Sequence, residues 1–527
     1  MGKPLKCLIS ILLLAGLVGI FFWPLLCGKE VFYFGDFLGF FYPLRHYAAE
    51  RIRSLEIPLW NPHILCGTPF LATWHSACFY PLSIIYYLLP FSIGFHIFIV
   101  VHIFLGALFM YLLARNWLKN DLCALVAAAA FAFSGYLISV TDYVNTLSSI
   151  VWIPLVLVLF EKALETRRWR YAVWAGIAFA VQVLAGGPEP VGLALLLLVA
   201  YTIRRRAAPR ALFYLALLLV IAFSISAVQL VPFGELFLNT ERWVEEISSH
   251  WSAGPLTLAR CIFPHFLARP GKWGLAWDEQ LWLKSSYLGM ATLLLALFAF
   301  FTVHERRTYL YGFAGLFFLL LSLGDWTPLW SLAFRFVPGF AAVRYPVKFL
   351  GGLTLCLSVL AGAGAKSLLA HLRLKRFLRL SSLLLASLGV LLILVFTAGY
   401  FFRGLLPSHL TGLSLGQTTN GGFGQVDEIT EAYLSTIQSF GRTGFFLILV
   451  AGVLLYAMRP KAKNFFVAGA LFGHYTRRPF EFCRRHLQDP ASHPGPRAHL
   501  HRLFGNLQKN SGHRAIYPAP RRPLPHL

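Results

Sequence analysis

The residue best placed for chemistry is a carboxylate near the start of the chain. Asp36 follows the first long apolar run by a few residues and lies among aromatic side chains. A carboxylate close to an apolar surface is partly desolvated, which raises its pKa and suits a general base that takes a proton from a hydroxyl group. The alternative is that Asp36 only caps the helix that follows it. The residues alone leave both interpretations open.

Two cations form a second candidate group. Arg344 and Lys348 lie in the stretch R-Y-P-V-K-F, just before another apolar run. A guanidinium and an ammonium group at this spacing are suited to hold one phosphate group. The alternative is that both side chains merely extend from the apolar run towards water.

Three further acids are secondary candidates. Asp142 and Glu189 each lie in a very short turn between apolar runs, and Glu235 follows another run in P-F-G-E. A solvated loop carboxylate is the commoner explanation for such residues. The chain has no CxxC pair and no HExxH, Walker, GxGxxG or GxSxG motif, so the sequence predicts no metal centre and argues against an ATP-driven pump, a dehydrogenase or a zinc hydrolase.

The composition indicates a polytopic membrane protein. Of the 527 residues, 57% are hydrophobic and only 13% are charged, whereas soluble chains carry about 25% charged residues. Twelve apolar runs are candidate membrane-spanning helices. They cover 7–27, 92–114, 122–140, 145–160, 171–185, 190–203, 211–231, 286–303, 308–324, 349–370, 380–402 and 444–458. The predicted fold class is therefore all-α, with about twelve transmembrane helices.

The basic residues predict the orientation of these helices. With the N-terminus in the cytoplasm, the cytoplasmic segments hold 21 Lys and Arg in 48 residues, and the external segments hold 14 in 178. This difference follows the rule that cytoplasmic loops are rich in Lys and Arg. Of the 22 acidic residues, 16 fall on the external side, where the longest loops also lie: 28–78, 232–285, 325–348 and 403–443. We therefore expect the active site on the extracytoplasmic face.

The composition changes abruptly near the C-terminus. Residues 1–471 form the predicted transmembrane domain, whereas 472–527 hold ten Lys and Arg, seven His and eight Pro. Such a basic segment cannot bury a core and is expected to be disordered. We favour a frameshift or truncation as its origin, and the alternative is a genuine basic tail that lies on anionic lipid.

The ordered motifs resemble one family. The elements G-D-F…Y-P-L, P-L-W-N-P…C-G-T-P-F…Y-P-L and P-G-F…R-Y-P-V-K-F, spread over about residues 1–470, are similar to those of the YfhO-type bacterial membrane proteins of the GT-C class of glycosyltransferases. The resemblance implies a GT-C-like enzyme that takes a sugar from an undecaprenyl-phosphate carrier and transfers it to an external acceptor such as a cell-envelope polymer. It also implies that Asp36 is the catalytic base or a metal ligand. Arg344 and Lys348 match the R-x-P-x-[KR]-F element, and their charges suggest that they hold the lipid phosphate.

The resulting expectation is a glycosyltransferase in the bacterial inner or plasma membrane, with no nucleic-acid partner. Dependence on a divalent cation, Mg²⁺ or Mn²⁺, is left open because the first loop has no D-x-D pair. One alternative is a transporter or flippase of a lipid-linked saccharide, which usually places ionisable residues at the membrane midplane. The other is a non-catalytic envelope assembly protein.

Overall fold

The structure is helical throughout the ranges that it describes. The computed structural model describes residues 3–32, 35–205, 208–240, 249–264, 266, 282–337, 340, 343–371, 375–401 and 424–457. In these ranges the regular elements are helices, and the only pairing of strand type is an isolated bridge between Asn61 and Thr68. The prediction of an all-α fold is confirmed.

Each of the twelve predicted apolar runs contains at least one described helix. In chain order these helices are α1 (Lys3–Phe21) with α2 (Trp23–Leu26), α5 (Phe91–Leu118), α6 (Asp121–Ala132) with α7 (Gly135–Ser139), α8 (Val144–Ile150) with α9 (Ile153–Thr166), α10 (Trp169–Leu184), α11 (Pro188–Arg204), α12 (Pro209–Leu238), α14 (Met290–Thr302), α15 (Arg306–Ser322), α17 (Leu350–His371), α18 (Lys375–Phe401) and α20 (Gly424–Ala457). Six helical stretches in the described ranges are long and apolar enough to cross a membrane. The chain is thus a multi-pass membrane protein, while the number of twelve spans stays a prediction.

The predicted external loops contain helices of their own. The loop 28–78 holds α3 (Tyr42–Arg53), and the loops 232–285 and 325–348 hold α13 (Pro255–Ile262) and α16 (Pro328–Phe336). Two helices extend into predicted loops, because α12 continues to Leu238 and α20 begins at Gly424. The segments 402–423 and 458–527, which include the predicted tail 472–527, lie outside the described residues.

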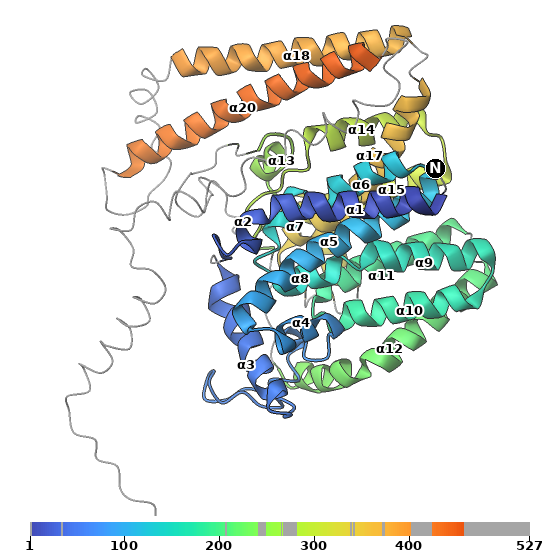
Figure 1. Cartoon of the computed structure of the whole chain (residues 1–527), viewed down its shortest axis with the longest axis vertical. Coiled ribbons are helices and arrows are strands. Elements are labelled where there is room, and N and C mark those ends of the chain that lie inside the picture. The colour runs from blue at the N-terminus through green and yellow to red at the C-terminus, as the bar shows by residue number, and fades with distance from the viewer. Residues whose placement is uncertain are drawn as a thin grey trace, which may run out of the picture. The chain divides into compact units, whose positions relative to one another are not determined.

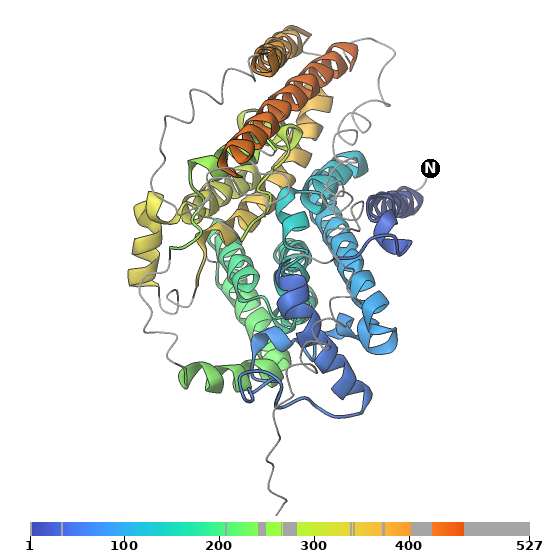
Figure 2. The ribbon, with the colours of Figure 1, turned by 90° about the vertical axis from the view of Figure 1, so that its left-hand side faces the viewer.

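Helix packing explains how distant parts of the chain meet. The helix α17 contacts α6, α14 and α15, the helix α5 contacts α6 and α9, and α10 lies against α12. Figures 1 and 2 show these helices as one bundle, with α18 and α20 paired beside it. A methyl group built on Gly389 of α18 would come within 2.7 Å of the Gly444 carbonyl oxygen of α20. Small residues at such crossings let two backbones approach closely, as is common in membrane proteins.

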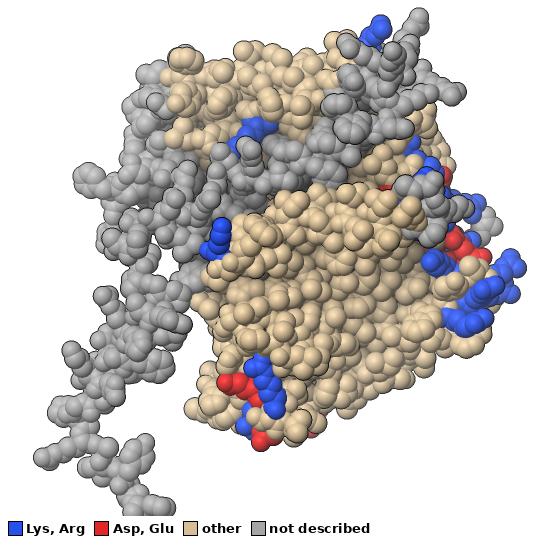
Figure 3. All heavy atoms as spheres, viewed as in Figure 1, with Lys and Arg blue, Asp and Glu red and all other residues tan. Residues whose placement is uncertain are grey.

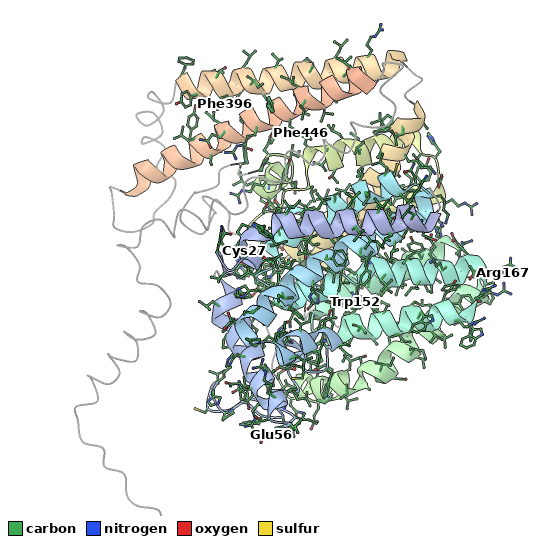
Figure 4. All side chains as sticks on the ribbon, viewed as in Figure 1. Cys27, Glu56, Trp152, Arg167, Phe396 and Phe446 are labelled. Carbon is green, nitrogen blue, oxygen red and sulfur yellow. The ribbon has the colours of Figure 1, made fainter. Side chains whose placement is uncertain are left out.

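The two ends of the bundle differ in charge. Lys and Arg gather at the end where α9 leads into α10, and an almost uncharged surface separates them from the opposite corner (Figure 3). Figure 4 labels Arg167 at the first end and Cys27 and Glu56 at the other. We call these ends the Arg167 end and the Glu56 end. At the Arg167 end, Glu161 is buried and pairs with Arg307 at 2.8 Å, which joins α9 to α15.

Candidate functional site

Asp36 lies at the Glu56 end, where the chain enters η1 (Phe37–Phe41), a short π-helical turn. Such turns are rare and often occur at functional sites. The ring of Phe37 is buried and stacks on Phe95 of α5 at 5.2 Å, which fixes the turn against the bundle. The Asp36 side chain is exposed and makes no capping hydrogen bond to the helical turn. The alternative that Asp36 serves as a helix cap is therefore not supported.

A second carboxylate and a cation lie close to Asp36. Asp142, in the turn between α7 and α8, is only 7% exposed and forms an ion pair with Lys284. A methyl group built on Gly35 would lie 3.7 Å from the Oδ2 atom of Asp142. We call Asp36, Asp142 and Lys284 the Asp36 group. The group combines two acids from different turns with one ammonium group from a third segment. These three segments are far apart in the sequence.

The environment raises the pKa of both acids in the Asp36 group. For Asp36, desolvation by neighbouring atoms raises the pKa, and the charge of Lys284 opposes this effect without cancelling it. For Asp142, burial again raises the pKa, Lys284 lowers it, and the negative charge of Asp36 raises it further. Two carboxylates that share one cation resist simultaneous ionisation. Acids with shifted pKa values in one cluster are typical of functional sites, and Asp36 is the more exposed of the two.

Of the second predicted group, Lys348 forms a largely buried pair with Glu189, a secondary candidate. Lys348 donates a hydrogen bond of 2.5 Å to the carboxylate of Glu189, in the first turn of α11, and the two side chains are only 13% and 16% exposed. The Lys348 ammonium also lies 5.4 Å from the ring centre of Trp282 and 5.0 Å from that of Tyr345. Burial disfavours ionisation of Glu189, but the adjacent ammonium outweighs burial, and the pKa of Glu189 lies below its ordinary value.

Aromatic rings connect the Glu189–Lys348 pair with the Asp36 group. Trp282 stacks on Tyr143 at 4.6 Å, and Tyr143 directly follows Asp142. Desolvation raises the pKa of Tyr143, and the charges of Asp36 and Asp142 raise it further. Since Trp282 contacts both Tyr143 and the Lys348 ammonium, one aromatic surface joins the two groups. Flat aromatic surfaces beside hydrogen-bonding groups are suited to sugar rings and apolar chains.

The other predicted residues occupy different positions. Arg344 is partly buried in the segment that leads to Lys348. Glu235 is exposed in the last turns of α12, and none of the polar contacts described above involves it. The prediction that Glu235 lies in a loop is wrong, because α12 continues through it to Leu238.

The structure adds Lys284 and Trp282 to the predicted residues. Trp282 and Lys284 lie in the predicted loop 232–285, where basic residues are sparse, and this scarcity is a signal that could have singled out Lys284. In the described residues, no group of three or more His, Cys, Asp and Glu side chains is close enough to hold a metal ion. The carboxylates of Asp36 and Asp142 are the residues that would supply ligands to Mg²⁺ or Mn²⁺, which proteins often bind through one or two carboxylates.

Comparisons with known proteins give matches among solved structures alone. No protein-family model matches the chain, and no curated protein matches it. Among solved structures, the chain is similar to ArnT from Cupriavidus metallidurans bound to undecaprenyl phosphate. The TM-score is 0.41 with 14% sequence identity, over 86% of this chain and 77% of that one. A likeness at this TM-score supports no conclusion about activity.

Proposed function

We propose that this chain is a membrane glycosyltransferase that moves a sugar from a polyprenyl-phosphate carrier to an acceptor hydroxyl group. The observation that carries the proposal is the Asp36 group. It provides an exposed carboxylate with a raised pKa, a buried carboxylate and an ammonium group at one end of a membrane-embedded bundle. A donor whose lipid part stays in the bilayer would present its sugar phosphate at one end of such a bundle. The family resemblance of the sequence points to the same reaction.

The proposed reaction uses Asp36 as the general base. Its carboxylate accepts the proton of the acceptor hydroxyl while the hydroxyl oxygen attacks the anomeric carbon. The bond between that carbon and the phosphate oxygen breaks, the polyprenyl phosphate leaves as an anion, and the configuration at the anomeric carbon inverts. Arg344 and Lys348 stabilise the departing phosphate, Lys348 with the ammonium hydrogens that Glu189 does not take.

The proposed orientation places the site on the extracytoplasmic face of a bacterial inner or plasma membrane. The support is the gathering of Lys and Arg at the Arg167 end, which matches the cytoplasmic side of membrane proteins. The acceptor would then be a glycan or another polymer of the cell envelope.

The test is sugar transfer in membranes that contain the full chain. Radiolabelled polyprenyl-phosphate sugars are supplied with cell-envelope acceptors, and Asp36→Asn is compared at matched expression. Loss of a general base lowers rates by about 10²- to 10⁴-fold. Glu56→Gln is the control, because Glu56 is an exposed carboxylate of the same loop that pairs only with exposed Arg51 among the contacts described. Transfer that persists in Asp36→Asn refutes the assignment of the base, and absence of transfer by every variant favours the flippase or assembly alternatives.

A further inference from the structure

A buried arginine determines how a neighbouring amide group is oriented. Arg45 of α3 is fully buried, and its guanidinium donates to the Ser76 carbonyl oxygen at 2.6 Å and to Asn145 Oδ1 at 2.7 Å. Arginine has only donors. The atom of Asn145 that faces Arg45 must therefore be the amide oxygen, and the amide nitrogen must point the other way.

The orientation of Asn145 in turn determines the tautomer of His75. The Asn145 amide nitrogen lies 3.0 Å from the Gly186 carbonyl oxygen and 2.8 Å from His75 Nδ1. Because this nitrogen donates one hydrogen to each, Nδ1 of His75 must accept and carries no hydrogen of its own. A neutral imidazole then has its hydrogen on Nε2. Protonation of Nδ1 would set two N–H groups against each other, so the contact also disfavours the imidazolium form.

His75 lies between the two halves of the site. Its side chain is exposed, and its ring meets those of Phe40 and Phe41 edge-on at 5.9 and 6.4 Å, within the turn that Asp36 opens. Through Asn145 it is also linked to the Gly186 carbonyl oxygen, in the turn that leads to Glu189.

The segment that carries His75 is fastened to the bundle. The indole nitrogen of Trp74 donates to the Val183 carbonyl oxygen at 2.7 Å, and the Gln229 amide donates to the Leu71 carbonyl oxygen at 2.8 Å. These bonds to α10 and α12 hold the segment just before His75, and the bond from Arg45 to the Ser76 carbonyl oxygen holds the residue after it. The direction of the imidazole ring is therefore set by the fold.

We propose that Arg45 and Asn145 are positioning residues that hold His75 as a neutral Nε2–H donor for a phosphate oxygen of the substrate. This inference rests on the proposed function and deepens it by adding a group that binds the carrier phosphate. An imidazole with an accepting Nδ1 and a protonated Nε2 has no lone pair left for a proton. The role of general base therefore stays with Asp36.

The first test measures binding of undecaprenyl phosphate to the purified full chain in detergent. His75→Ala removes the donor, and a hydrogen bond to a charged group is worth a factor of about 10 to 100 in affinity. His75→Gln places an amide N–H near the position of Nε2 and is expected to stay within about threefold of the parent. His63→Ala is the matched control, since His63 is an exposed histidine of the same loop. Unchanged binding in His75→Ala, or equal losses in the Ala and Gln variants, overturns the proposal.

The second test observes the tautomer directly. The ¹⁵N spectrum of the histidine-labelled full chain is compared with that of His75→Gln, which identifies the His75 signals. We expect a hydrogen on Nε2 in the parent and on Nδ1 in Asn145→Asp, where a carboxylate oxygen replaces the donating nitrogen. A parent His75 protonated on Nδ1 refutes the inference, even if the Asp variant fails to fold. Neither measurement depends on sugar transfer, so failure of the proposed function is distinguishable from failure of this inference.

Discussion

The Glu189–Lys348 pair allows a quantitative prediction of stability. Glu189→Gln keeps the shape of the side chain and removes its charge, which leaves the Lys348 ammonium mostly buried. Removing one partner of a buried ion pair costs about 3–5 kcal/mol. The rings of Trp282 and Tyr345 face the ammonium in the parent and in the variant, so they do not change the difference. Glutamine still accepts one hydrogen bond, so we expect the free energy of unfolding to fall by about 3 kcal/mol, the lower end of this range.

The assay is unfolding of the purified chain in mixed micelles with increasing SDS, arranged as a double-mutant cycle. Lys348→Met alone leaves a buried carboxylate, whereas the double variant leaves no buried charge at this position. The double variant should lose less than the sum of the single variants, by a coupling of about 1–3 kcal/mol. Glu56→Gln breaks only an exposed pair with Arg51 and should cost about 0–1 kcal/mol. Strictly additive losses in the cycle would refute the pairing of Glu189 with Lys348.

The same pair predicts a dependence of stability on pH. The pKa of Glu189 is lower in the folded chain than in the unfolded one. Its contribution is therefore fully present above the pKa of the unfolded state and is lost as the pH falls through the lowered pKa of the folded state. The parent should lose stability over this acidic range, and Glu189→Gln should lose less of it.

Three further outcomes are expected. Sugar transfer should fall as the pH drops through the raised pKa of Asp36. Lys284→Gln removes the charge that lowers this pKa, so the acidic limb of the pH profile of transfer should move to higher pH. An acidic limb that does not move contradicts this. Gly186→Ala should cost about 1–3 kcal/mol in the micelle unfolding assay, because φ is +89° and the methyl group would lie 2.5 Å from the Trp74 carbonyl oxygen; Gly192→Ala, with nothing within 4 Å, is the control. Transfer should survive EDTA, because Lys284 already supplies a positive charge to the acids; a loss that Mg²⁺ or Mn²⁺ restores contradicts this.

The positions of individual site residues were only partly predictable. Asp36 and Lys348 stand out in the sequence because each is a charged residue beside a long apolar run. The partners of Lys348 and of Asp142 were not predictable, since Glu189 and Lys284 are separated from them by 159 and 142 residues. In the sequence, Glu235 cannot be distinguished from the other candidate acids, because it also follows an apolar run. Only the structure shows that α12 extends through Glu235.

The sequence by itself determined the membrane class, the helical runs and the charge difference between the two sides. These properties depend on contiguous stretches of apolar residues and on the basic segments between them, so neighbours along the chain are sufficient to encode them. The tertiary structure decided which charged groups meet. The chain of contacts from Arg45 through Asn145 to His75 joins three segments, and its hydrogen bonds require distances near 2.7 Å. Such distances arise only when helices pack at a definite register, and no local pattern in the sequence specifies that register.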